Sequence, residues 1–219
     1  MRILTPLEAR VLGVLVEKQS TVPDTYPLSL NALVAGCNQK TARAPVIEAS
    51  DDDVLAAIDG LKSLSLALEG GGSRVVKFEH NMGRVLGVPS QSVALLAVLM
   101  LRGPQTAAEL RLNCERLHRF ADISSVEAFL DELATKDPAR VVKLARAPGE
   151  REARWAHLLC GEVAAGPARA GAANDADGGS LSAGELAALK AEQTRLAAQV
   201  EALQAQVLRL TRELGLSAE

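Results

Sequence analysis

The sequence is poor in aromatic residues and in cysteine, and both shortages limit its fold and chemistry. It has three Phe, one Trp and one Tyr among 219 residues, whereas 48% of the chain is hydrophobic. Its cores must therefore be built mainly from Leu, Val, Ala and Ile. The three widely spaced cysteines cannot form a paired disulfide framework, so we expect buried free thiols in a reducing compartment.

Long apolar runs and a charged-then-apolar N-terminal leader are also missing. The longest apolar run covers residues 93–101, which is the length of a buried helix and far short of a membrane span. The absence of a leader argues against secretion. We expect a cytoplasmic protein without a membrane partner.

No segment carries a strong excess of positive charge. The net charge is −3 and the pI is about 5.7. Residues 1–85 hold nine basic against ten acidic side chains, residues 86–160 hold ten against nine, and residues 161–219 hold five against eight. This balance argues against strong non-specific binding of nucleic acid by the whole molecule.

The stretch 26–80 predicts two helices followed by a β-hairpin. Ser29 is a good N-cap before an apolar i, i+3, i+4, i+7 stripe. Ser50 precedes three aspartates, which the helix dipole favours in a first turn. The glycines at 70–72 mark the turn of the hairpin. The inward stripe of the second helix is expected to be Val54, Leu55, Ile58 and Leu61. Helix, helix, hairpin is the order of a winged helix-turn-helix.

The same order returns further along the chain. Thr106 and Glu109 form a capping box, and Ser124 or Ser125 is expected to cap the next helix. Strands are expected on either side of the turn at Pro148–Gly149. We interpret the two stretches as copies of one small domain.

This repeat defines the expected organisation. The predicted fold class is mainly α with small β hairpins (α+β): two tandem winged helix-turn-helix domains and a C-terminal coiled-coil helix. The first domain also includes a helix that Thr5 and Glu8 cap, ending near Gln19, and residues 81–89 are expected to be a linker. The expected segments are the domains 1–85 and 86–160, a flexible linker 161–180 and a coiled-coil helix 181–216.

The C-terminal segment carries a heptad repeat. Leucines recur every seven residues at d, and the a positions are mostly Val or Leu with one Gln, which favours a parallel homodimer. The alternative is a helix that folds back on the body of the protein. The predicted dimerisation residues are Leu189, Leu196, Val200, Leu203, Val207 and Leu210.

Several stretches between residues 4 and 160 together resemble the bacterial YceH-like family. The matching stretches include Leu4–Gly13, Tyr26–Leu33, Cys37–Lys40, Arg102–Thr106 and Trp155–Leu158. Members of that family look like two winged-helix domains in tandem. The resemblance implies the fold but no established biochemical role.

DNA is the first partner to consider, because the second helix of such a domain enters the major groove and the wing contacts the backbone. The expected role is then regulatory, through DNA binding of weak or assisted affinity. Surface Lys and Arg side chains are more often simply solvated. The candidate DNA-binding residues are Lys40, Arg43, Arg74, Lys77, Lys143, Arg146, Arg151 and Arg154.

The alternative is a protein–protein interaction adaptor that does not bind DNA. Base readout favours Arg, Lys, Asn or Gln near the start of the recognition helix. The first domain offers Asp51, Asp52 and Asp53 at that place. We expect no enzymatic activity, cofactor or metal, because the three histidines have no nucleophile beside them in the sequence and no clustered metal ligands.

Overall fold

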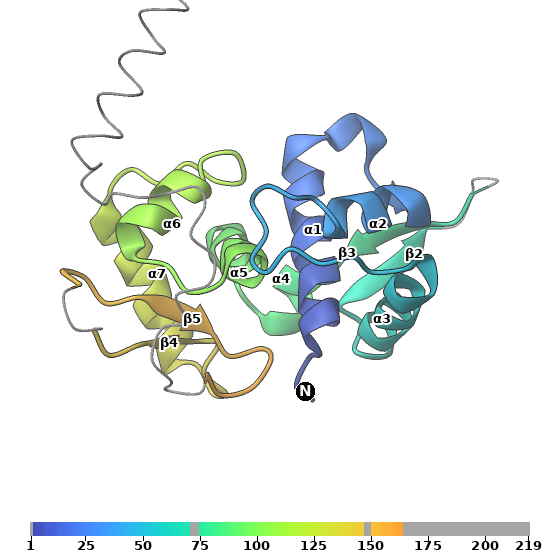
Figure 1. Cartoon of the computed structure of the whole chain (residues 1–219). Coiled ribbons are helices and arrows are strands. Elements are labelled where there is room, and N and C mark those ends of the chain that lie inside the picture. Colours follow the sequence, from blue (N-terminus) through green and yellow to red (C-terminus); the bar gives the residue numbers. More distant parts are fainter. Residues whose placement is uncertain (1, 71–74, 147–149, 164–219) are drawn as a thin grey trace, which may run out of the picture. The chain divides into compact units, whose positions relative to one another are not determined.

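The computed structural model describes residues 2–70, 75–146 and 150–163 (Figure 1). Helices and small antiparallel sheets make up this part of the chain, which confirms the α+β expectation. The elements are α1 (Pro6–Thr21), a 3-10 turn (Pro23–Thr25), β1 (Leu28–Ser29), α2 (Leu30–Cys37), α3 (Asp51–Ser63), β2 (Ala67–Gly70), β3 (Lys77–His80), α4 (Met82–Leu86), α5 (Ser90–Arg102), α6 (Ala107–Asn113), α7 (Ile123–Thr135), β4 (Val141–Lys143) and β5 (Trp155–His157).

Local capping sets where most helices begin. Thr5, Ser50 and Thr106 each accept a hydrogen bond from the backbone N–H three residues on, and the acidic side chain there bonds back to complete a capping box. Ser29 caps α2 by accepting from the N–H of Ala32. These four predicted helix starts are confirmed.

The predicted cap of α7 was wrong. Asp122, not Ser124 or Ser125, is the N-cap, and its carboxylate accepts from the N–H of Ser125 at 2.7 Å. Ser125 is the third residue of the helix, and its hydroxyl donates back to the carbonyl of Asp122 at 2.7 Å. An Asp side chain is favoured as an N-cap and at the positive end of the helix dipole, which explains the earlier start.

The linker expected at residues 81–89 contains a short helix, α4. Met82 and Leu86 of α4 are buried, so this segment contributes to the core. The helix ends at Gly87, whose φ of 63° lies in the left-handed region that favours glycine. A helix of five residues is too short to show an apolar period in the sequence.

The sheets bring distant segments together in matching ways. β3 lies between β1 and β2, and Leu28 pairs with Phe78. In the second half β4 pairs with β5, and Gln105 forms a β-bridge with Trp155. Because Leu28 and Gln105 each immediately precede the cap of a helix, the same helix–helix–hairpin arrangement occurs twice. We call residues 26–80 and 103–157 the first and second repeats.

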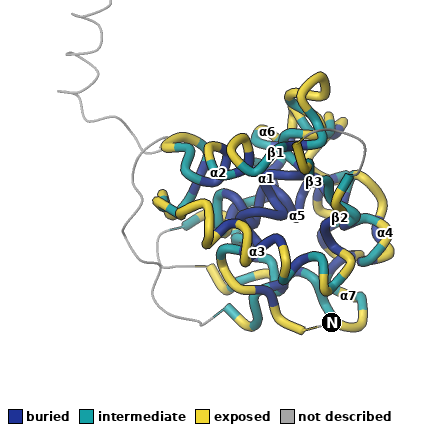
Figure 2. The backbone as a smooth tube through the Cα atoms, turned by 90° about the vertical axis from the view of Figure 1, so that its right-hand side faces the viewer, coloured by how far each residue is buried: buried dark blue, intermediate teal, exposed yellow. Residues whose placement is uncertain are grey.

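Helices α1 and α5 join the two repeats in one core. Ten consecutive residues of α5, from Ser92 to Leu101, are buried, and α1 packs directly against this helix (Figure 2). The contact is close at Gly13, where an added Cβ would lie 2.9 Å from Cγ of Leu101. Buried side chains of both repeats belong to the same hydrophobic cluster. No helix in the described residues is long and apolar enough to cross a membrane.

Several sequence predictions lie outside the described residues. They are the hairpin turn at Gly71 and Gly72, the candidate Arg74, the turn at Pro148–Gly149, the linker beyond residue 163 and the C-terminal coiled coil with its dimerisation residues. They stay predictions.

Candidate interaction grooves

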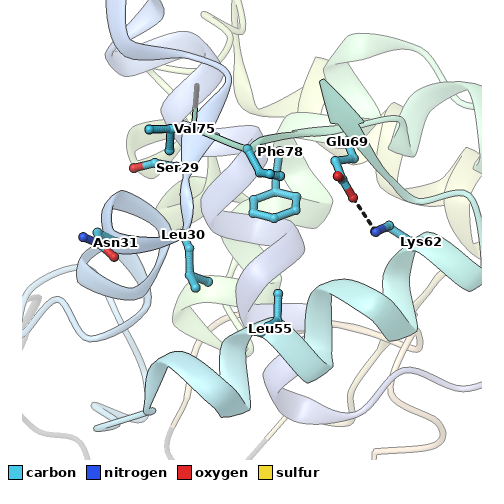
Figure 3. A pocket seen from close by; sticks show the side chains of 9 residues that line it. Ser29, Leu30, Asn31, Leu55, Lys62, Glu69, Val75 and Phe78 are labelled. Carbon is cyan, nitrogen blue, oxygen red and sulfur yellow. Dashed lines mark hydrogen bonds and ion pairs between the residues drawn. The ribbon is translucent and has the colours of Figure 1, made fainter. Parts of the chain in front are cut away.

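The first repeat contains a groove of about 540 Å³ between α3, the start of α2 and the hairpin (Figure 3). We call it the first groove. Leu30 of α2, Leu55 of α3 and Phe78 of β3 line it from three elements. Its remaining lining residues are Ser29, Asn31, Lys62, Glu69, Val75 and Val76.

The prediction that Leu55 belongs to the inward, buried stripe of α3 was wrong. Val54, Ile58 and Leu61 are fully buried, but Leu55 is 40% exposed and faces the first groove. Val76 in the hairpin is also exposed, at 49%. Large exposed aliphatic side chains that line a concavity are typical of a binding surface.

An ion pair lies on one side of the first groove. Nζ of Lys62 lies 2.6 Å from Oε2 of Glu69 and 3.6 Å from Oδ1 of Asp59. The hydrogen bond to Glu69 raises the pKa of Lys62, with the nearby carboxylate charges acting in the same direction. Lys62, the single cation among the described residues that line the groove, is therefore neutralised by neighbouring carboxylates.

The exposed face of α3 is acidic. Asp51 and Asp59 stand four residues before and after Leu55, so all three share one side of the helix. Asp52 and Asp53 are exposed in the same first turn. Hydrogen bonds from Ser50 lower the pKa of Asp53, which keeps that carboxylate ionised.

The second repeat has a groove of about 420 Å³ at the matching place, which we call the second groove. Ala107, Glu127 and Trp155 line it at the positions that Leu30, Leu55 and Phe78 occupy in the first groove. The ammonium group of Lys143 lies 5.3 Å from the centre of the Trp155 ring, a cation–π contact. The duplicated groove is therefore charged where the first is apolar.

Among the DNA-binding candidates of the first repeat, Arg43 is structural. Its side chain has no exposed surface, and Nη2 lies 2.6 Å from Oε2 of Glu17. It also donates to the carbonyl oxygens of Gly36 and Ala42 and to Oε1 of Gln39. In this conformation the guanidinium group holds the connection between α2 and α3 and presents no donor to a phosphate.

The other first-repeat candidates are separated. Lys40 is exposed in the α2–α3 connection, whereas Lys77 is half-buried at the start of β3. Arg74 lies outside the described residues. The described candidates of this repeat therefore come from different elements and differ in exposure.

The second repeat gathers more of its cations, but among carboxylates. Arg154 donates to Glu109 at 3.0 Å and to Glu150 at 3.2 Å. Lys143 and Arg146 line the second groove together with Glu127 and Glu152. Arg146 and Arg151 are exposed beside this groove's hairpin.

Cys37 and Cys114 are buried free thiols, as expected, whereas Cys160 is only partly buried. Burial raises the pKa of the Cys37 thiol to about 11 and that of Cys114 to about 12. His80 bonds to Gln19 through Nε2 at 2.7 Å and accepts from the N–H of Met82 at Nδ1. Burial lowers the pKa of both His80 and His157 to about 4. No group of His, Cys, Asp and Glu in the described part of the chain is arranged to hold a metal.

Sequence reasoning missed the first groove. The available signal was a Leu at the edge of the apolar stripe of α3, in the same turn as three aspartates. Whether such a Leu is buried depends on where the hairpin packs against α3. The sequence pattern does not specify that position.

Comparison with known proteins places the chain in a family. The family described as "Protein of unknown function, DUF480" matches residues 4–150. A UPF0502 protein of Burkholderia multivorans is 68% identical over the whole chain and 92% of its own length. A UPF0502 protein of Leptothrix cholodnii is 67% identical over 99% of the chain and 97% of its own length. The chain therefore belongs to the DUF480 (UPF0502) family of bacterial proteins, for which no biochemical activity is described.

Proposed function

We propose that this chain is a protein–protein interaction adaptor built from two winged-helix repeats, with no enzymatic activity. The winged-helix assignment is supported by the repeated helix–helix–hairpin order. It is supported further by the matched pairings Leu28 with Phe78 and Gln105 with Trp155. In this architecture α3 and α7 correspond to the recognition helices of DNA-binding relatives of the fold.

The observation that carries the proposal is the chemistry of these two helices. The exposed face of α3 presents Asp51, Asp52 and Asp59, and that of α7 presents Glu127 and Asp131. Carboxylates on a helix that enters a groove would face phosphates and lower the affinity for DNA. The same faces suit a partner protein with a basic surface.

DNA binding is the second candidate function, and one observation favours it. Lys143, Arg146 and Arg151 are exposed around the hairpin of the second repeat, where a wing contacts the DNA backbone. The adaptor is preferred because Glu127 and Glu152 line the second groove together with Lys143 and Arg146, and Glu150 is paired with Arg154. A continuous positive face would have favoured DNA.

A salt series separates the two candidates. Fluorescence anisotropy of labelled mixed-sequence duplex DNA would be measured with full-length protein between about 50 and 200 mM salt. We expect no steep salt-dependent binding. Tight binding at low salt that Arg146→Ala with Arg151→Ala weakens would overturn the adaptor proposal in favour of DNA.

Site-specific photo-crosslinking in cells tests the adaptor directly. A crosslinking amino acid would replace one exposed residue at a time on both repeats: Val46, Leu55, Leu112, Ile123 or Arg151. We expect a discrete protein adduct from one surface and none from the others. If no position gives a protein adduct while DNA is bound at low salt, the adaptor proposal fails.

A further inference from the structure

We propose that the first groove binds a short basic segment of a partner protein, anchored by large aliphatic or aromatic side chains. This inference rests on the proposed adaptor function and gives its partner a chemistry. It starts from one juxtaposition, in which the exposed apolar side chains of Leu55 and Val76 line a concave surface beside an acidic helix face.

The floor of the groove supplies the apolar half of the recognition. Leu30, Leu55 and Phe78 converge on a single space from three elements (Figure 3). Val76 of the hairpin also lines this space. Leu55 is 40% exposed and Val76 is 49% exposed in the described structure. Covering these side chains with the apolar anchors of a partner removes their surface from water, which drives association.

The rim supplies the charge. Asp51, Asp52 and Asp59 border Leu55 on α3, and the charge of Lys62 is offset by Asp59 and Glu69. The rim therefore keeps a net negative charge. Lys and Arg side chains that flank the anchors of a partner would meet this rim, whereas an acidic segment or a nucleic acid would be repelled.

The same charges argue against two other occupants. In a two-fold symmetric dimer formed through this groove, the acidic rims of the two copies would face and repel each other. The chain's own C-terminal segment 181–219 holds four basic and five acidic side chains, so it brings no positive charge to the rim. A basic partner segment is the occupant that complements both the floor and the rim.

The second groove provides a matched internal reference. It has Ala107 where the first has Leu30, and Glu127 where the first has Leu55. The double substitution Leu30→Ala with Leu55→Glu therefore gives the first groove the side chains that the fold already accommodates in the second. Leu30 and Leu55 are only partly buried, so this variant is expected to keep the fold.

Peptide selection tests the proposal without knowledge of the natural partner. Random peptides displayed on phage would be selected on the full-length protein, and the enriched peptides would be synthesised and their affinity measured by fluorescence anisotropy. We expect net positive peptides with at least two large apolar residues. Their Kd should rise about tenfold or more in the Leu30→Ala, Leu55→Glu variant and stay unchanged in a Glu127→Gln control. Circular dichroism would verify that both variants are folded.

Several results would overturn the proposal. They include no enrichment, enrichment of acidic peptides, or equal binding by the double variant. Displacement of the peptides by a synthetic 181–219 segment would identify the chain's own tail as the occupant. A dimer that dissociates in the double variant, measured by sedimentation velocity, would identify a second copy. If the in-cell crosslinks come only from Leu112 or Ile123, the adaptor function survives and the groove assignment fails.

Discussion

At the scale of single residues, Arg43 links α1 to the connection that follows α2. Its buried guanidinium is paired with Glu17, and Arg10 holds the same region by donating to the carbonyls of Cys37 and Pro45. Burial raises the pKa of Glu17, but the hydrogen bond and charge of Arg43, with a smaller effect of Lys18, bring it below its ordinary value. Arg43, a DNA-binding candidate in the sequence, is therefore part of the framework together with Arg10.

Replacement of Arg43 should destabilise the protein strongly. Arg43→Ala leaves the largely buried Glu17 carboxylate with only Lys18, at 3.3 Å, as an ion-pair partner. Loss of one member of a buried pair costs about 3 kcal/mol. Urea unfolding would measure the change. Arg84→Ala, at an exposed position of α4, is the matched control and should stay within about 0.5 kcal/mol of the parent protein. A variant at position 43 that is as stable as this control would contradict the structural role.

The two histidines at the ends of β3 and β5 should make the fold sensitive to acid. Burial lowers the pKa of His80 and of His157 to about 4, whereas an unfolded histidine titrates at about 6.5. Between these values the unfolded chain binds more protons, so stability decreases as the pH falls from about 6.5 to about 4. Each histidine contributes up to about 3 kcal/mol of this loss.

Urea unfolding at pH 7 and pH 4.5 checks this prediction. Removing one titrating group in His80→Gln should reduce the difference in unfolding free energy between the two pH values. Ala128→Gln, at an exposed position of α7 without a titrating group, is the control and should leave the difference unchanged. Equal pH dependence in His80→Gln and the parent protein would refute the assignment.

At the scale of elements, the residue that caps α7 can be tested by mutation. Asp122 accepts from the N–H of Ser125, whereas Ser124 is an exposed residue in the first turn of the helix. Asp122→Ala should lower the free energy of unfolding by about 1 kcal/mol, the usual cost of losing a cap. Ser124→Ala should have almost no effect. If chemical denaturation shows the larger loss for Ser124→Ala, the cap has been assigned to the wrong residue.

Most helix starts set by local chemistry could be predicted from the sequence, whereas β1 and the first groove, which depend on distant contacts, could not. Thr5, Ser29, Ser50 and Thr106 were identified correctly because a cap depends on residues only a few positions away. By contrast, β1 exists only because Leu28 meets Phe78, fifty residues later. The first groove has the same origin, since its walls come from segments that are far apart in the chain.

The candidate site was predicted less well than the fold. Lys and Arg were selected by charge and position, but the sequence does not show that Arg43 is buried or that Arg154 is paired with Glu109 and Glu150. For the same reason, the apolar stripe of α3 does not reveal that Leu55 is exposed. Pairing and burial of side chains are tertiary properties, and a one-dimensional pattern gives only the residues that could take part.

At the scale of the whole molecule, the contact between α1 and α5 should couple the two repeats. An added Cβ at Gly13 would lie 2.9 Å and 3.0 Å from carbon atoms of Leu101 and 3.4 Å from the carbonyl of Ala97. Gly13→Val should therefore force the helices apart and cost about 2 kcal/mol, as overpacking of a core does. Ala56→Val, on the exposed side of α3, is the control.

Amide hydrogen exchange would show whether Gly13→Val destabilises both repeats or only one. Because one hydrophobic cluster spans both repeats, Gly13→Val should reduce protection in α3 and α7 together. Loss of protection in α3 alone would mean that the repeats are independently stable, as separate domains at 1–85 and 86–160 would be.

The predicted C-terminal coil would determine how many copies of the chain act together. Leu196 and Leu203 occupy neighbouring d positions of the heptad, where a charged side chain would be buried between two helices. Leu196→Glu with Leu203→Glu in the full chain should therefore give a monomer by sedimentation velocity, as should deletion of residues 181–219. Ala198→Glu with Ala205→Glu, at the f positions of the same two heptads, controls for the added charge. A double leucine variant that stays dimeric would place the dimer contact elsewhere, whereas a parent protein that is already monomeric would favour a helix that folds back. A dimer would present two first grooves, and two linked segments of one partner would bind it more tightly than either segment alone.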